Sequence, residues 1–158
     1  MDRERMQHHA ALVRLMSITE AFAVDLLAES VEAWASSAEV EVQTVWRTTV
    51  ESALMSWPKI KEAYAKWLKA GPPVINWDPV LGFVEARNAV AHGLGNLTRL
   101  QRKNRSKTIS TLGHGKIKLD AADAVELDEV VLKRAADECR MFIETLDAVV
   151  QFAPLSSG

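Results

Sequence analysis

Apolar residues recur at three- and four-residue steps along most of the chain, which is the periodicity of amphipathic α-helices. This pattern predicts five main helices, at about 5–35, 40–55, 57–70, 78–94 and 129–152. The first helix carries two adjacent apolar stripes, as expected where several other helices pack against it. We therefore predict an all-α fold, an up-down helical bundle of about five helices.

Start and stop signals support these bounds. The Gly-Pro-Pro sequence at 71–73 ends the third helix, because proline cannot continue a helix. Asp78 is a favoured N-cap for the fourth helix, and Gly93 and Gly95 offer a left-handed end. Asp128 is expected to cap the last helix.

Two short segments before the last helix have a different period. Polar and apolar residues alternate at 116–119 and again at 124–127, with 120–123 joining them. Alternation is typical of strands, so we expect a small β-hairpin packed on the bundle. Residues 108–112 fit either a strand or a helical turn.

Tryptophan is frequent in this chain, and exposed indoles can stack on nucleobases. Helical spacing favours the core instead, since aromatic side chains bury large apolar areas. Trp77, in the loop before the fourth helix, lacks that periodic support. The five tryptophans are Trp34, Trp46, Trp57, Trp67 and Trp77.

Composition narrows the class of protein. The chain has 158 residues, of which 48% are hydrophobic and 25% charged, so we expect one soluble domain over 1–158. The net charge of −2 shows that the chain as a whole is not a polycation, so any contact with nucleic acid must come from a local basic patch.

The chain has a single cysteine, Cys139, so it cannot form an intramolecular disulfide. Cys139 lies on the apolar stripe of the last helix. There is no secretory signal or membrane-length apolar run, so we expect a cytoplasmic protein.

Three polar side chains interrupt the apolar pattern of the fourth helix. Arg87 falls at the edge of the buried stripe, where a charge needs a partner or a wet cleft. Asn88 and His92 are four residues apart and therefore neighbours on an adjoining face. At roughly 100° per residue, Arg87 and His92 lie roughly 140° apart, so a second copy related by a two-fold axis could complete a shared site. Glu85 is expected to face solvent.

A basic run follows that helix without an intervening acid. It can be a solvated loop, or a rim that binds phosphates by displacing counterions from a nucleic acid. On the second interpretation, the substrate-binding residues are Arg99, Arg102, Lys103 and Arg105, with Lys107 continuing the run.

His8 and His9 are expected to be exposed or capping. No cluster has metal-ligand spacing, so we expect neither a metal nor a cofactor.

The sequence Arg-Asn-Ala-Val-Ala-His-Gly at 87–93 resembles the signature of the HEPN superfamily, a group of all-helical domains. That signature is Arg, a polar residue, a short spacer and His, and Arg87, Asn88 and His92 match it. The order of the helices also agrees, so the resemblance covers nearly the whole chain. It is strongest to the prokaryotic subgroup called RiboL-PSP-HEPN or MAE-like HEPN.

The resemblance implies a metal-independent endoribonuclease that acts as a toxin or antiphage defence effector. Such domains typically form homodimers in which the motifs of two protomers line one cleft. On this hypothesis His92 acts as acid or base, Arg87 holds the scissile phosphate, and Asn88 orients the reacting groups. The products would carry 2′,3′-cyclic phosphates.

Other interpretations remain open at this point. Arg87 could instead pair with an acid such as Glu20 or Glu62, leaving Asn88 and His92 as ordinary polar residues near a helix end. The chain could also be a non-catalytic module for dimerisation, nucleotide binding or a partner protein such as a nucleotidyltransferase-type antitoxin. A metal-dependent nuclease is disfavoured, because no acidic cluster has ligand spacing.

Overall fold

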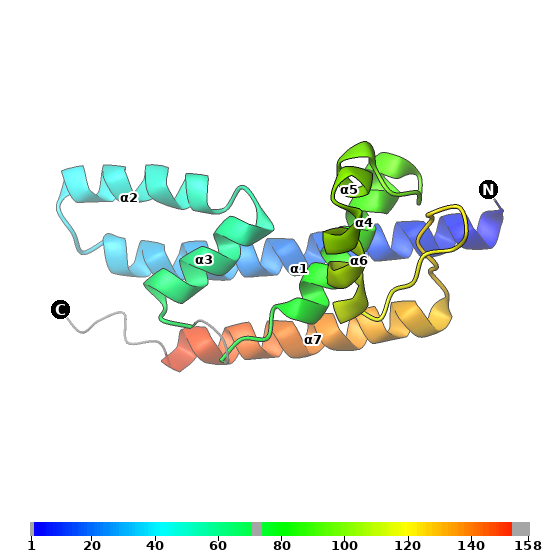
Figure 1. Cartoon of the computed structure of the whole chain (residues 1–158). Coiled ribbons are helices and arrows are strands. Elements are labelled where there is room, and N and C mark those ends of the chain that lie inside the picture. The colour runs from blue at the N-terminus through cyan, green and yellow to red at the C-terminus, as the bar shows by residue number, and fades with distance from the viewer. Residues whose placement is uncertain (1, 71–73, 153–158) are drawn as a thin grey trace. The chain divides into compact units, whose positions relative to one another are not determined.

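The computed structural model describes residues 2–70 and 74–152, and the predicted all-α fold class is confirmed there (Figure 1). Phe152 is described in its backbone alone. The described helices are α1 (Arg3–Ala35), α2 (Val40–Ala53), α3 (Trp57–Trp67), α4 (Asp78–Gly93), α5 (Arg99–Lys103), α6 (Arg105–His114) and α7 (Glu129–Phe152).

Contacts divide the chain into two compact units. Unit 1 comprises the described residues up to Thr19 together with Trp77–Phe142, and unit 2 comprises those of Glu20–Asn76 and those from Ile143 onward. The two longest helices, α1 and α7, therefore contribute a part to each unit. Helices α4, α5 and α6 belong to unit 1, whereas α2 and α3 belong to unit 2. The single domain over 1–158 stays a prediction.

The core of unit 1 is built around α4. Phe83 is fully buried on this helix, and Trp77 just before it packs edge-to-face on Phe142 of α7 with ring centroids 5.1 Å apart. Cys139 of α7 contacts Met16 of α1, with Sγ 3.8 Å from Sδ. Cys139 is 1% exposed, which agrees with its place on the apolar stripe predicted for the last helix.

Unit 2 is held by a buried tyrosine and a group of indoles. Tyr64 of α3 donates a hydrogen bond to the carbonyl oxygen of Ala23 in α1 at 2.7 Å. Trp46 of α2 lies edge-to-face against Trp34 and Trp67, with centroids 4.9 and 5.5 Å away. Trp57 and Trp77 are core residues as predicted, but Trp34 is 39% exposed, so its assignment to the core was wrong.

The helix bounds follow the predictions closely, with two corrections at α4. Trp77 rather than Asp78 occupies the N-cap position. The left-handed residues after the helix are Leu94 (φ 54°) and Gly95 (φ 100°), whereas Gly93 is still helical. The predicted stop at 71–73 lies outside the described residues. Asp128 caps α7 as predicted, because its Oδ1 accepts the backbone N–H of Val131 at 2.8 Å.

The predicted β-hairpin is wrong. Within the described residues, the segment forms a single bridge between Leu119 and Val125, and Ala124 bridges instead to Asn96. Two backbone hydrogen bonds flank the bridge, from Asp120 N–H to the carbonyl oxygen of Ala124 at 2.8 Å and from Glu126 N–H to that of Lys118 at 2.9 Å. The N–H of Val125 instead donates to the carbonyl oxygen of Gly95, in the loop after α4, at 2.8 Å. In this irregular segment Ile117, Ala124 and Val125 are buried, whereas Lys116 and Lys118 are exposed.

The basic run is helical rather than a loop. Thr98 and Gln101 form a capping box at the start of α5, in which each side chain bonds the other residue's backbone N–H. The undecided residues 108–112 lie within α6. Helix α6 packs against α4, and α5 packs against α6 (Figure 1).

Candidate functional site: a groove between α4 and α6

Helices α4 and α6 cross in close contact at Gly82. A Cβ built on Gly82 would lie 2.6 Å from the backbone nitrogen of Gly115 and 2.9 Å from the carbonyl oxygen of Thr111. Such distances are far inside van der Waals contact, so only glycine fits at this point. The crossing also places the ring of Phe83 against Gly115. It therefore fixes how α6 lies on α4.

Toward the C-terminal end of α4, an open groove of about 490 Å³ separates α4 from α5 and α6. Its α4 wall is formed by Glu85, Asn88 and His92, whose spacing of three and four residues puts them on one helix face. The facing wall carries amides, hydroxyls and one cation. Its members are Thr98, Leu100, Gln101, Asn104, Lys107, Thr108 and Thr111.

Arg87 joins this site through Asn88. The guanidinium Nη1 donates a hydrogen bond to Asn88 Oδ1 at 3.2 Å, and both residues are half-buried. Within the described part of unit 1, Arg87 has no carboxylate within ion-pair distance. Of the two acids considered as structural partners, Glu62 is paired with Lys66 at 2.6 Å.

His92 is exposed at the end of the groove, so its imidazole is open to solvent and to a ligand. Two apolar side chains are exposed beside it: Leu94 is 73% exposed and Leu100 is 69% exposed. Leu94 is also held at a positive φ, which a residue with a Cβ seldom adopts. The end of α4 is therefore a surface with strained backbone and uncovered apolar groups.

Glu85 was expected to face solvent, and that expectation is wrong. It is half-buried, and the side-chain amide of Gln101 donates to both its carbonyl oxygen and its Oε1 at 2.9 Å. Gln101 is itself 6% exposed and fixed by the capping box with Thr98. The sequence signal was the spacing of Glu85 from Asn88 and His92, which places all three on one face.

The predicted phosphate-binding residues divide into two groups. Arg102 Nε donates to the carbonyl oxygen of Leu97 at 2.9 Å, and Arg105 is paired with Asp123 at 2.8 Å. The hydrogen bond from Arg105 lowers the pKa of Asp123. Arg99 and Lys103 are exposed and have no side-chain partner among the described residues. None of these four lines the groove, whereas the neighbouring Lys107 does.

A second groove of about 540 Å³ lies between the start of α1 and the loop before α7. His9, expected to be exposed or capping, is buried at 7% exposure and packs on Gly95. Burial is the main reason that its pKa is lowered, with further contributions from Arg5 and His8. His8 Nδ1 lies 3.1 Å from the carbonyl oxygen of Leu127.

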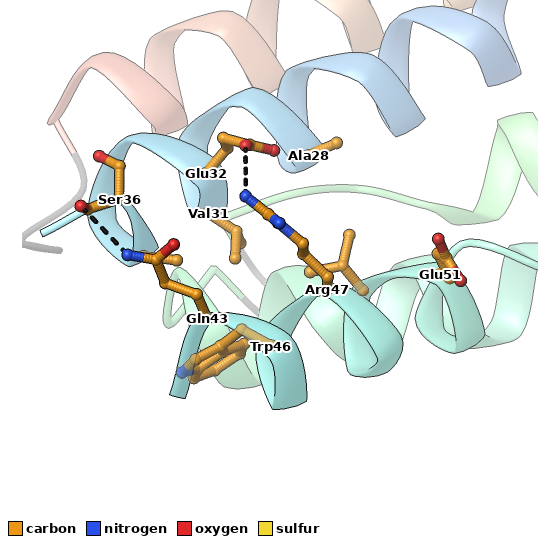
Figure 2. Close-up of a pocket in the computed structure, with 10 residues that line it drawn as sticks. Ala28, Val31, Glu32, Ser36, Gln43, Trp46, Arg47 and Glu51 are labelled. Atoms are coloured by element: carbon orange, nitrogen blue, oxygen red, sulfur yellow. Dashed lines mark hydrogen bonds and ion pairs between the residues drawn. The ribbon is translucent and has the colours of Figure 1, made fainter. Parts of the chain in front are cut away.

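Unit 2 has its own pocket of about 320 Å³ between α1 and α2 (Figure 2). Glu32 and Arg47 approach to 3.9 Å at its mouth, and the side-chain amide of Gln43 donates to the carbonyl oxygen of Ser36 at 3.4 Å. The two charges compensate one another, and the lining residues include neither an imidazole nor a thiol. The unit 1 groove is therefore the better candidate for chemistry.

In the part of the chain that the structure describes, no group of three or more His, Cys, Asp or Glu residues suits a metal ion. The described helices are either too short or too polar to cross a lipid bilayer. Comparison with protein-family models, curated proteins and solved structures gave no match to this chain.

Proposed function

We propose that this chain is a metal-independent endoribonuclease of the HEPN type, acting as a toxin or antiphage defence effector. The observation that carries the proposal is the convergence on one open groove of Asn88, His92 and, through its hydrogen bond to Asn88, Arg87. Lys107 supplies a cation on the opposite wall. These are the chemical groups that metal-free RNA cleavage requires.

Cleavage begins when the ribose 2′-oxygen attacks the adjacent phosphorus and ends when the 5′-oxygen leaves. His92 is exposed, so its imidazole can reach the reacting oxygens and accept or donate a proton. Arg87 stabilises the negative charge that develops on the phosphate, because a guanidinium presents several donors in a fixed plane. Asn88, held by Arg87, presents its amide N–H groups to the ribose or the phosphate. The fragments carry 2′,3′-cyclic phosphate and 5′-hydroxyl ends.

A homodimer belongs to this proposal. On an ideal helix, positions 87 and 92 point roughly 140° apart, so a second copy could add its own Arg87 or His92 to the site. The exposed Leu94 and Leu100 beside the groove offer apolar surface to a second copy. RNA is the substrate, and an antitoxin of the nucleotidyltransferase type is the proposed regulatory partner.

The alternative is a non-catalytic module that binds a nucleotide or a partner protein. This alternative is favoured because Arg102 and Arg105 already bond to other groups of the protein. Fewer cationic side chains then remain to bind an RNA backbone. The facing wall is also rich in amide and hydroxyl groups, which suit recognition as well as catalysis.

The deciding experiment incubates the purified protein with a labelled RNA pool in EDTA. Arg87→Ala and His92→Ala should each lose at least about 100-fold in rate, because each removes a group that acts on the transition state. His114→Ala, which removes an exposed histidine at the end of α6, is the matched control and should cleave like the wild type. RNA binding without cleavage by any of these proteins would favour the binding module.

A further inference from the structure

The carboxylate of Glu85 shares the groove with His92, and the proposed roles of Arg87, Asn88 and His92 do not use it. We propose that Glu85 is the general base that takes the 2′-OH proton, and that His92 of the same protomer is the general acid. This inference rests on the proposed ribonuclease function. It assigns both proton transfers to side chains of a single groove.

The spacing along α4 suits this division of labour. His92 follows Glu85 by seven positions, so their Cα atoms are about 10 Å apart along the helix axis. In a displacement at phosphorus the attacking and leaving oxygens lie on opposite sides of the phosphorus atom, so the base and the acid must stand apart with the phosphate between them. Asn88 lies between the two on the same face, where the phosphate and ribose would sit.

Glu85 is also held as a reactive group must be. Gln101 fixes one carboxylate oxygen, Oε1, and also the backbone carbonyl of Glu85, both at 2.9 Å. Among the described residues Glu85 has no ion-pair partner, so Oε2 is available to a ligand in the groove. A carboxylate locked by a buried neighbour loses little freedom on binding substrate, which favours catalysis.

Lys107 completes the arrangement from the other wall. Lys107 lines the groove opposite Glu85 and His92. In the proposed complex its ammonium group binds a non-bridging oxygen of the phosphate between them. In the step itself, the 2′-O–H bond breaks and its proton moves to Glu85 while the 2′-oxygen forms a bond to phosphorus. The bond from phosphorus to the 5′-oxygen then breaks, and protonated His92 gives its proton to the leaving oxygen. Water afterwards returns both groups to their starting protonation states.

Glu85→Gln separates catalysis from structure, because a glutamine oxygen still accepts the hydrogen bond from Gln101. We expect a loss of about 100-fold or more in cleavage rate together with loss of the low-pH limb of the rate profile. Affinity for a non-cleavable 2′-O-methyl RNA should stay unchanged. Glu144→Gln, which makes the same charge change at an exposed position on α7, should behave like the wild type.

Mixing two inactive proteins tests whether both groups act within one protomer. A dimer of one Glu85→Gln copy and one His92→Ala copy contains no intact groove, so it should stay inactive. Recovery of activity on mixing would show that base and acid come from different protomers, and would overturn the inference. Wild-type activity in Glu85→Gln would also overturn it while leaving the ribonuclease function intact. Failure of the wild type to cleave would instead remove the proposed function itself.

Discussion

Gly82 on α4 lies against Gly115 at the end of α6 so closely that a Cβ on Gly82 would fall 2.6 Å from the Gly115 nitrogen. The contact involves backbone atoms on the α6 side, which cannot rotate away as a flexible side chain can. It joins the two walls of the groove at one end. The shape of the candidate site therefore depends on a pair of glycines that take no part in its chemistry.

Gly82→Ala should consequently destabilise unit 1. We expect the free energy of unfolding to fall by about 3 kcal/mol, at the upper end of the usual effect of overpacking. Gly113→Ala is the matched control, since a Cβ at Gly113 meets nothing within 4 Å. That control should be neutral or more stable by about 0.5–1 kcal/mol, because alanine favours a helix over glycine. Urea titration of both variants measures the difference, and equal stability would contradict the tight crossing.

Lys107 and Arg105 should contribute differently to RNA binding, although they are two residues apart. Lys107 lines the groove, whereas Arg105 is paired with Asp123. Lys107→Ala should lower affinity for a non-cleavable RNA and reduce the slope of log K against log salt by about 0.7, the value for one contact to a single strand. Arg105→Ala should change that slope much less. Fluorescence anisotropy at several salt concentrations measures both slopes, and equal effects would argue against binding in the groove.

His9 should make stability depend on pH. Its pKa is lowered from 6.5 in the folded protein, mainly by burial, so the unfolded chain binds a proton more readily. Stability should therefore be unaffected by this group above pH 6.5 and should decrease as the pH falls below that value, until the folded protein also binds the proton. Unfolding midpoints between pH 7.5 and 5.5 measure the effect. His9→Gln should flatten this dependence, whereas His114→Gln should leave it in place.

Cys139 should not react with thiol reagents in the folded protein. Its side chain is 1% exposed, and burial raises the pKa of the thiol, so little thiolate is present at neutral pH. A thiol-reactive chromogenic reagent should therefore find no fast-reacting group in the native state and one group after denaturation. Rapid labelling of the native protein would show that this part of α7 opens readily.

The helices were largely predictable because each carries a clear apolar period with local end signals. Asp128 is an example, since a capping aspartate needs only its own helix to act. The hairpin prediction was wrong because the alternation of polar and apolar residues carries no information about distant partners. The backbone N–H of Val125 bonds to Gly95, thirty residues away in sequence. The helical state of the basic run depended on the Thr98–Gln101 capping box, a local signal that the charges obscured.

The relative placement of Asn88 and His92 could be predicted from the sequence, but the residues that surround them in the groove could not. The spacing of Asn88 and His92 correctly placed them on one face. The packing of α6 on α4 decides which side chains face Asn88 and His92. The sequence alone therefore could not show that Lys107, and not its basic neighbours, lines the groove. Glu85 looked like an ordinary exposed acid because its partner, Gln101, comes from another helix. The hydrogen bond between Arg87 and Asn88 joins adjacent residues, yet the choice of partner for Arg87 required the structure.

The proposed metal-free cleavage of RNA uses the 2′-hydroxyl as nucleophile. The chemistry of the fragment ends after digestion in EDTA tests it, with a matched substrate that is 2′-deoxy at the cleaved positions. We expect 2′,3′-cyclic phosphates and 5′-hydroxyls from the RNA, and no cleavage of the deoxy substrate. Fragments with 3′-hydroxyl ends, or equal cleavage of both substrates, would contradict it.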